Sequence, residues 1–364
     1  MSNIILPGTY ITVRDEGLIS VGGVSTGNIG IVGTATDGSP NRVQVLNSFT
    51  DARDIFGSQD ENSGTKAQPT TLLKALELLF ANGASTVYAV RAADESVKSY
   101  AAGLELLANE TVNLVLLAGQ DATNDGMVEI LNAHLASTET EQKERIGLIG
   151  CNGSVDPSKI IADKERLVND RGRMVYVAPG IKFSKRDPAT GTKTTEVLSG
   201  AYTAAAVAGL IASLPIQASP TNKTVNLSGL ATKFNHGQLT NLVKANVLTI
   251  EQREGLRVVK GITTSNNNAW SQITTRRIVD YATYGVRLAC NPYVGKLNNQ
   301  RVRSAMKATL DGFLTRMVES EALIGYQLEV TATRAQEVAG QAMVNMVIRP
   351  TFSIDYIMVT MSLG

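Results

Sequence analysis

Apolar runs and helix-like stretches alternate regularly along the first part of the chain. The short apolar runs have the length of buried strands, and the stretches between them place apolar residues at helical spacing. The expected strands are 29–33, 86–90, 113–117, 145–149 and 173–177, and the expected helices are 72–81, 97–108, 126–136 and 157–169. Continuous apolar strands separated by helices are typical of a parallel sheet that is covered on both faces. The pattern therefore predicts an α/β domain with a mostly parallel sheet over residues 25–220.

The pattern then changes to polar connections, short β-prone stretches and two long helices. The helices are expected at 274–289 and 300–319. In the second one, apolar residues keep helical spacing, so one of its faces is expected to lie in a core. Two β-prone segments follow, at 326–332 and 343–349. These elements predict a carboxy-terminal α+β domain over residues 221–350.

Both ends of the chain carry a β-prone segment that has no partner strand next to it in the sequence. We assign residues 1–24 to an amino-terminal β arm and hinge, and residues 351–364 to a carboxy-terminal β arm. A lone strand is unstable in water, because its backbone groups stay unpaired and its apolar side chains stay wet. The arms therefore pair either with their own subunit, which the pattern alone favours, or with sheets of neighbouring chains. The residues expected to make these contacts are Tyr10, Ile11, Val13, Ile354, Tyr356, Ile357 and Val359.

The composition excludes several classes of protein. The chain has 364 residues, with 34 Lys plus Arg against 33 Asp plus Glu and 5% aromatic residues. A nucleic-acid-binding protein would need a basic excess and stacking rings, so no nucleic acid partner is expected. The two cysteines, Cys151 and Cys290, are too few for a disulfide scaffold.

Neither a secretory signal nor a membrane span is expected. The amino terminus has no basic region before its short apolar run, so we expect the protein to be made in the cytoplasm. The charge-free stretch at 197–222 is too rich in small and polar residues to cross a bilayer. Its central part is better interpreted as a buried, Ala-rich helix.

The candidates for small-molecule chemistry are few. Gly27–Gly33 has the glycines of a phosphate-binding loop, but Gly30 and Gly33 fall in the expected strand rather than between a strand and a helix. His134 and His236 have no other histidine or cysteine at metal-ligand spacing, and we expect both at the surface or at helix ends. No catalytic residue, cofactor-binding residue, cofactor or metal ligand is therefore predicted.

Four residues at the ends of expected strands keep an enzymatic interpretation open. Cys151 is the best-placed nucleophile, although a buried apolar role is the stronger expectation. Asp121, Asp125 and Asp156 also follow strands, where open α/β sheets bind ligands, but acidic residues at such places also cap helices. The alternative function is thus a cytoplasmic α/β enzyme that binds a nucleotide or other small ligand at the carboxyl ends of the strands.

The second long helix has an unusual order of charges. Arg301, Arg303 and Lys307 lie in its first half, and Glu319 and Glu321 lie at its end. The helix dipole favours the opposite order. Local helix stability does not explain this order, so the three cations form either a solvated face or a basic patch that meets an acidic partner surface.

The order of several short motifs along the chain is informative. They are Leu6–Ile11, Gly30–Ala35, Ala204–Ala212, Val259–Thr264, Arg276–Asp280, Tyr293–Asn299 and Val347–Pro350. Together they resemble the sheath proteins of contractile phage tails and of related contractile injection particles, over nearly the whole chain. The carboxy-terminal motifs are the most specific. The chain departs from larger sheath proteins in lacking room for a large inserted outer domain.

The resemblance implies a structural subunit rather than an enzyme. It implies subunits stacked in sixfold rings around an inner tail tube, which shorten and widen together and drive the tube through a target envelope. Neighbouring subunits would be linked by exchanged amino- and carboxy-terminal strands, which reverses the preference stated above for the arms.

The same resemblance implies the partners of the chain. They are further copies of the chain, the inner tail tube protein, and the baseplate and tail terminator proteins, with no membrane in the resting state. Arg301, Arg303 and Lys307 would then meet the tube. The product would be a virion tail or a phage-tail-like particle, assembled from protein made in the bacterial host cytoplasm.

Overall fold

The computed structural model describes residues 26–57, 71–153, 156–186 and 193–362. The chain divides into two compact units. The first, which we call the sheet unit, takes in Ser25–Ala282 and Pro350–Gly364, and the second, which we call the helical unit, takes in Thr283–Arg349. The expected arm residues Tyr10, Ile11 and Val13 lie outside the described residues.

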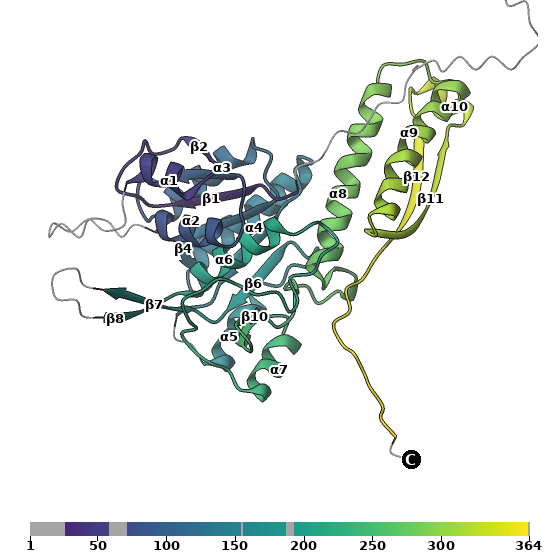
Figure 1. The fold of residues 1–364 in the computed structure, drawn as a ribbon. Helices are drawn as coiled ribbons and strands as arrows, with labels where there is room; N and C mark the ends of the chain where they lie inside the picture. Colours follow the sequence, from purple (N-terminus) through teal and green to yellow (C-terminus); the bar gives the residue numbers. More distant parts are fainter. Residues whose placement is uncertain (1–25, 58–70, 154–155, 187–192, 363–364) are drawn as a thin grey trace, which may run out of the picture. The chain divides into compact units, whose positions relative to one another are not determined.

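An eight-stranded sheet forms the centre of the sheet unit, with the strand order β10-β9-β6-β5-β4-β1-β3-β2 (Figure 1). The inner strands pair in parallel, and β2 and β10 pair antiparallel at the two edges. The mostly parallel sheet predicted from the apolar runs is therefore confirmed. The strands are β1 (Ile29–Gly33), β2 (Val43–Leu46), β3 (Val87–Arg91), β4 (Leu114–Asp121), β5 (Ile146–Gly150), β6 (Met174–Ala178), β9 (Leu248–Gln252) and β10 (Leu256–Val258).

Helices cover both faces of this sheet and bury two separate apolar clusters. One cluster includes side chains of α1 (Phe49–Phe56), α2 (Leu72–Ala81) and α6 (Gly200–Ser213), and the other includes side chains of α3 (Val97–Ala108), α4 (Asp125–Thr140), α5 (Pro157–Glu165) and α7 (His236–Lys244). Successive strand residues point to opposite faces, so Ile31 joins the first cluster and Val32 joins the second. This double burial explains why the strands are continuous apolar runs in the sequence.

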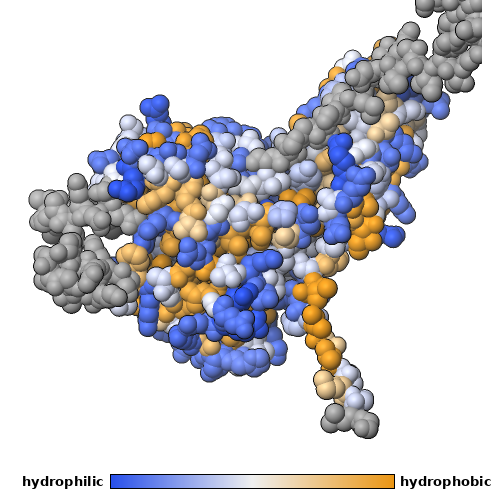
Figure 2. Space-filling view, viewed as in Figure 1, coloured by the Kyte–Doolittle hydropathy of each residue, from blue (hydrophilic) through white to orange (hydrophobic). Residues whose placement is uncertain are grey.

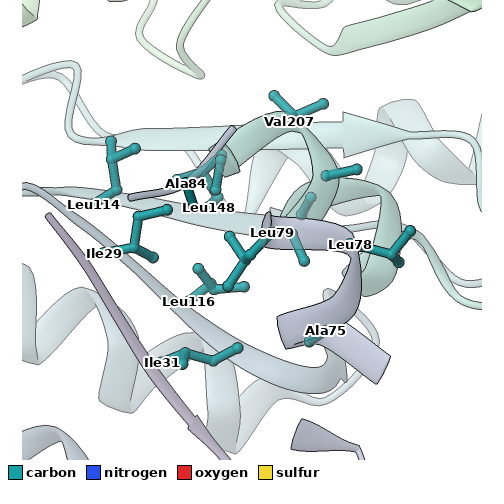
Figure 3. Close-up of a cluster of buried hydrophobic side chains, with 14 of the residues drawn as sticks. Ile29, Ile31, Ala75, Leu78, Leu79, Ala84, Leu114, Leu116, Leu148 and Val207 are labelled. Carbon is teal, nitrogen blue, oxygen red and sulfur yellow. The ribbon is translucent and has the colours of Figure 1, made fainter. Parts of the chain in front are cut away.

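The small residues of α6 let this helix approach its neighbours closely. A Cβ on Gly200 would lie 2.6 Å from the backbone nitrogen of Cys151, and one on Gly209 would lie 2.3 Å from the carbonyl oxygen of Leu79. Leu79 and Val207 belong to the apolar cluster between α6, α2 and the sheet, which is drawn in Figure 3. The charge-free stretch noted in the sequence is thus a core helix. Within the described ranges, no helix combines the length and the apolar character that a bilayer span requires.

The strands beyond residue 220 belong to the same sheet as those before it. β9 pairs in parallel with β6, and β10 pairs with β9. The compact units divide after Ala282, whereas the sequence assigned residues 221–350 to one separate α+β domain. A further pair, β7 (Ile181–Arg186) and β8 (Lys193–Leu198), forms an antiparallel hairpin that no expected element covered.

The helical unit contains the end of α8 (Ile273–Cys290), then α9 (Gln300–Glu319) and a two-stranded sheet of β11 (Leu323–Thr331) and β12 (Met343–Pro350). The short helix α10 (Arg334–Val338) lies between the two strands in the sequence. α9 packs on β11 and buries one face, which confirms the apolar face predicted for this helix. The buried residues of that face are Thr309, Leu310, Phe313, Leu314 and Met317.

Gly285 of α8 packs directly against α9, because a Cβ added there would lie 2.0 Å from Cζ of Phe313. We expect Gly285→Ala to lower the free energy of unfolding by about 1–3 kcal/mol, because the buried ring must move. The matched control is Gly312→Ala on α9, where nothing lies within 4 Å of the added Cβ. The control should be stabilised by about 0.5–1 kcal/mol through its helix propensity.

Urea unfolding followed by circular dichroism measures both variants. If Gly285→Ala proved as stable as the Gly312→Ala control, the contact between α8 and Phe313 would be looser than described.

Candidate functional site

The two strongest candidates for chemistry are buried among apolar residues. Cys151 follows β5, is 1% exposed and belongs to the second apolar cluster, as expected. Burial raises the pKa of its thiol to about 12, so the reactive thiolate is scarce at neutral pH. His134 was expected at the surface or at a helix end, and this was wrong: it lies inside α4 and is 8% exposed. Burial and the Arg145 charge lower the pKa of His134 to about 3.

The place where doubly wound sheets bind ligands is filled by side chains. In this sheet it lies between the carboxyl ends of β1 and β4, because β1 pairs with β3 on one side and with β4 on the other. Thr34, Thr71 and Tyr100 occupy it and are at most 7% exposed. The Thr34 amide donates to Thr71 Oγ1 (3.0 Å), and Tyr100 Oη donates to the carbonyl oxygen of Ala118 (3.1 Å).

The helix start at this point is also closed. The amino end of a helix can bind a phosphate through its free N–H groups. Here the amides of Thr71 and Leu72, at the start of α2, both donate to the carbonyl oxygen of Thr34, at 3.1 and 3.0 Å. Gly33, the last residue of β1, serves close packing, since a Cβ added there would lie 2.6 Å from Cβ of Ala118. A nucleotide would have to displace all of these contacts.

The three acidic residues at strand ends have local structural roles. Asp156 caps α5 and accepts a hydrogen bond from the Ser158 amide (2.9 Å). Asp121 accepts from the Thr123 amide (3.0 Å), and Asp125 forms an ion pair with Arg166. No group of three or more His, Cys, Asp or Glu residues that could hold a metal ion occurs in the described part of the chain.

A buried ionic cluster fixes the first half of α8 to the sheet unit. Arg173 is 2% exposed and donates to both oxygens of Asp280, each at 3.1 Å. Arg276 donates to the same carboxylate (2.7 Å) and stacks on the ring of Trp270, at 4.2 Å from its centroid. Glu139 lies 3.0 Å from Nε of Arg173. Burial opposes the charge of Arg173, but Asp280 and Glu139 outweigh it and raise the pKa of Arg173.

A second arginine of α8 binds backbone carbonyls. Arg277 donates to the carbonyl oxygens of Leu214 (2.9 Å), Pro215 (3.2 Å) and Thr26 (3.2 Å). Burial lowers the pKa of Arg277 to about 10. Arg277 thus ties α8 to the segment before β1 and to the segment after α6. The segment Arg276–Asp280 was recognised as a motif in the sequence, but its role could not be predicted. The partner of Asp280 is Arg173, which is 107 residues away along the chain.

The carboxy-terminal segment is extended (Figure 1), and its apolar side chains are exposed. Residues 351–362 form no helix or strand, although a strand was predicted here. Ile354, Tyr356, Ile357 and Val359 are between 71% and 83% exposed. Figure 2 shows hydrophobic atoms along this segment. Apolar side chains gathered in this way on an extended segment are typical of a surface that is covered in an assembly.

The two-stranded sheet of β11 and β12 leaves backbone groups open. Within the described residues, each of these strands pairs only with the other, so each has one free edge. The residues of β12 alternate strictly between half-buried and exposed. Ile324 on β11 and Val347 on β12 are 69% and 54% exposed. A two-stranded sheet is marginally stable by itself, and a free edge can accept another strand.

The three cations of α9 do not share one environment. Arg303 donates to Glu337 Oε1 of α10 (3.0 Å) and to Asn298 Oδ1 (2.9 Å). This ion pair gives Arg303 a structural role that the charge order of the helix did not reveal. Arg301 and Lys307 are exposed.

The comparison with known protein families decides the identity of the chain. Residues 94–264 match the phage tail sheath protein central domain, and residues 265–364 match the phage tail sheath C-terminal domain. The chain belongs to the contractile tail sheath family. This confirms the resemblance found in the ordered motifs. No curated protein sequence matches the chain.

Solved structures with the same fold come from contractile particles. A chain of the contracted helical sheath of the anti-feeding prophage has 19% sequence identity and a TM-score of 0.76, over 99% of both chains. A chain of the anti-feeding prophage baseplate has 19% identity and a TM-score of 0.73, over 100% of both chains. The contracted sheath complex of PVC, an extracellular contractile injection system, has 16% identity and a TM-score of 0.73, over 100% of this chain and 98% of that one. At these identities the likeness shows the sheath fold.

The family is one of structural subunits, and the arrangement of this sheath protein agrees with that. The candidate nucleophile is buried, the ligand position of the sheet is filled, and the acidic residues cap or pair. What the fold exposes is an apolar extended segment and a small sheet with free edges. The surfaces that matter for this sheath protein are thus surfaces for assembly.

The ionic cluster of α8 generates a prediction about stability. We expect Asp280→Asn to lower the free energy of unfolding by about 3 kcal/mol, because Arg173 and Arg276 lose the charge that compensates their burial. Asp54→Asn, at an exposed position of α1, is the matched control and should be close to neutral. Urea unfolding of both variants gives the difference. Equal stability of the two would mean that the cluster does not hold α8.

Proposed function

We propose that this protein is the subunit of a contractile sheath that polymerises as stacked sixfold rings around an inner tail tube. On contraction the sheath drives the tube through a target envelope. Neighbouring subunits are linked by β strands that the terminal arms exchange. The observation that carries this proposal is the extended carboxy-terminal segment, whose apolar side chains are exposed and whose residues 351–362 form no strand with the subunit itself.

Strand exchange follows from what these groups require. Adding an extended segment with exposed Ile, Met and Val side chains to a sheet lowers the free energy, because its backbone groups pair and its apolar surface leaves water. Among the described residues, β11 and β12 pair only with each other, so their sheet offers complementary edges. A neighbouring copy of the chain supplies both parts in every ring, so each subunit donates an arm and receives one.

The partners follow from the family and from the particles that contain its relatives. A similar chain occurs in the anti-feeding prophage baseplate, which supports association of this protein with a baseplate. Sheath relatives in the anti-feeding prophage and PVC particles support polymerisation with further copies of the chain. We include the inner tube protein and a tail terminator protein as the remaining partners of the polymer.

The enzymatic alternative has no observation in its favour. A ligand at the carboxyl ends of the strands would have to displace the buried Thr34, Thr71 and Tyr100. We therefore keep the prediction that the protein works without catalysis and without a cofactor. The particle is either a virion tail or a phage-tail-like particle, made from protein synthesised in the host cytoplasm.

Removal of an arm should separate folding from assembly. Proteins that lack residues 1–16 or residues 353–364 should keep the sheet unit folded but lose the ability to form polymers, because the strand that would pair with a neighbouring subunit is lost with each arm. Circular dichroism tests the fold, and sedimentation with electron microscopy tests assembly. Regular tubes from either truncated protein would rule out strand exchange as the main link.

Docking on the tube should depend on the exposed cations of α9. Contacts that must release on contraction suit exposed charges, each of which contributes only about 0–1 kcal/mol but is repeated along the polymer. We expect Arg301→Glu with Lys307→Glu to leave the subunit folded while assembly around the tube fails or gives empty tubes. Attachment of the unmodified protein should weaken as salt increases.

The matched control for docking is Arg303→Glu, which breaks the ion pair with Glu337 and should act mainly on the stability of the helical unit. Co-expression with the tube protein and electron microscopy compare the variants. If the Arg301→Glu, Lys307→Glu protein formed full-length extended particles, α9 would not be part of the docking surface.

A further inference from the structure

We propose that the carboxy-terminal arm is divided at Tyr356. Residues 351–356, which we call the anchored segment, stay bound to their own subunit. Residues 357–364, which we call the exchange segment, pair with a second copy of the chain. The division rests on the strand exchange proposed above and states where along the arm that exchange begins.

The side chain of Gln272 binds the backbone of the anchored segment as a neighbouring strand would. Its Oε1 accepts a hydrogen bond from the Ser353 amide (3.1 Å), and its Nε2 donates to the Ser353 carbonyl oxygen (3.3 Å). Both backbone groups of Ser353 are therefore satisfied within the subunit. Thr274 adds a contact between its Oγ1 and the Ser353 Oγ, at 3.3 Å.

Asp355 is the second point of attachment. It accepts hydrogen bonds from Gln272 Nε2 (3.0 Å) and from Thr221 Oγ1 (3.4 Å), and Lys260 Nζ lies 3.6 Å from its Oδ2. Its side chain is only 11% exposed. A carboxylate bound by three partners resists transfer to another subunit, because each partner would lose its contact.

The contacts end at Tyr356. Lys260 Nζ donates to Tyr356 Oη (3.4 Å) and lies 5.2 Å from the centroid of its ring. Beyond it, Ile357, Met358 and Val359 are 83%, 95% and 78% exposed. Within the described part of the chain, these three residues make no hydrogen bond, so their backbone groups are available to a partner.

The partner of the exchange segment is a second copy of the chain. The segment adds to the edge of that copy's sheet of β11 and β12. Residues 357–364 carry no charged side chain, and Ile357, Met358 and Val359 are exposed. Within the described residues, β11 and β12 pair only with each other, so each keeps an edge without a partner strand. A β-prone segment without a partner and a sheet edge without one have complementary needs.

One short stretch of the chain, at the start of α8, holds the anchored segment. Gln272 and Thr274 bind Ser353, and Gln272 also binds Asp355. A neighbour that binds the exchange segment therefore pulls on the start of α8. The buried cluster of Arg173 and Asp280 fixes that start to the sheet unit.

A disulfide lock tests where exchange begins. Thr274→Cys with Ser353→Cys, in a Cys290→Ser background, joins two side chains that lie in contact, so the disulfide should form within the isolated subunit. Oxidised and reduced forms of this protein are then compared for assembly. We expect no loss of assembled polymer on oxidation, because the locked residues never leave their subunit. Assembly that fails only when the lock is closed, or a lock that never closes, would overturn the division at Tyr356.

Hydrogen exchange of the unmodified protein gives an independent measurement. The Ser353 amide should be protected both in the isolated subunit and in the polymer, whereas the amides of residues 357–361 should become protected only in the polymer. Protection of Ser353 that appears only on assembly would contradict the anchored segment. A polymer in which residues 357–361 stay unprotected would contradict strand exchange itself, so the two failures are distinguishable.

Discussion

The attachment of the start of α8 to the sheet unit is the interaction on which the other features of this sheath protein depend. Arg173 and Arg276 share the Asp280 carboxylate inside the fold, and Arg277 binds three carbonyl oxygens nearby. Such a cluster is costly to bury and costly to break, because the loss of one partner leaves the others without compensation. It therefore gives the first half of α8 one fixed position in the sheet unit, and the residues at its start give the carboxy-terminal arm a fixed point of departure.

A subunit whose arm pairs with a neighbouring subunit needs a fixed point at which the arm is attached to its own fold. The exposed residues beyond Tyr356 have unpaired backbone groups and wet apolar side chains, and both costs are removed by pairing with another sheet. Pairing transmits force only if the root of the arm does not slide. Gln272 and Asp355 provide that restraint through hydrogen bonds to backbone and side chains of the segment. A fixed root and an exposed apolar end thus follow one another within one short stretch of the chain.

Much of the fold was predictable because its signals are local. The apolar runs of the parallel strands and the spacing of Leu310, Phe313 and Leu314 on α9 report burial directly. The pairing of β9 with β6 was not predictable, because strand partners are set by contacts between distant segments. His134 was misplaced for a different reason: the polar residues near it in the sequence favoured a surface position, whereas its ring is buried and contacts Arg145, 11 residues further along the chain.

The assembly surfaces were predictable only in part. An orphan β-prone segment after Pro350 is visible in the sequence, but its division at Tyr356 depends on Thr221, Lys260 and Gln272, which lie far away along the chain.

The most direct test of the central claim is an electron cryomicroscopy reconstruction of the assembled sheath in which residues 351–362 can be traced. The account predicts density for Ser353 and Asp355 beside Gln272 of the same subunit, and density for residues 357–361 as an added strand on the sheet of β11 and β12 of a neighbour. A segment that folds back on its own subunit throughout, or that leaves Gln272 entirely, would contradict it.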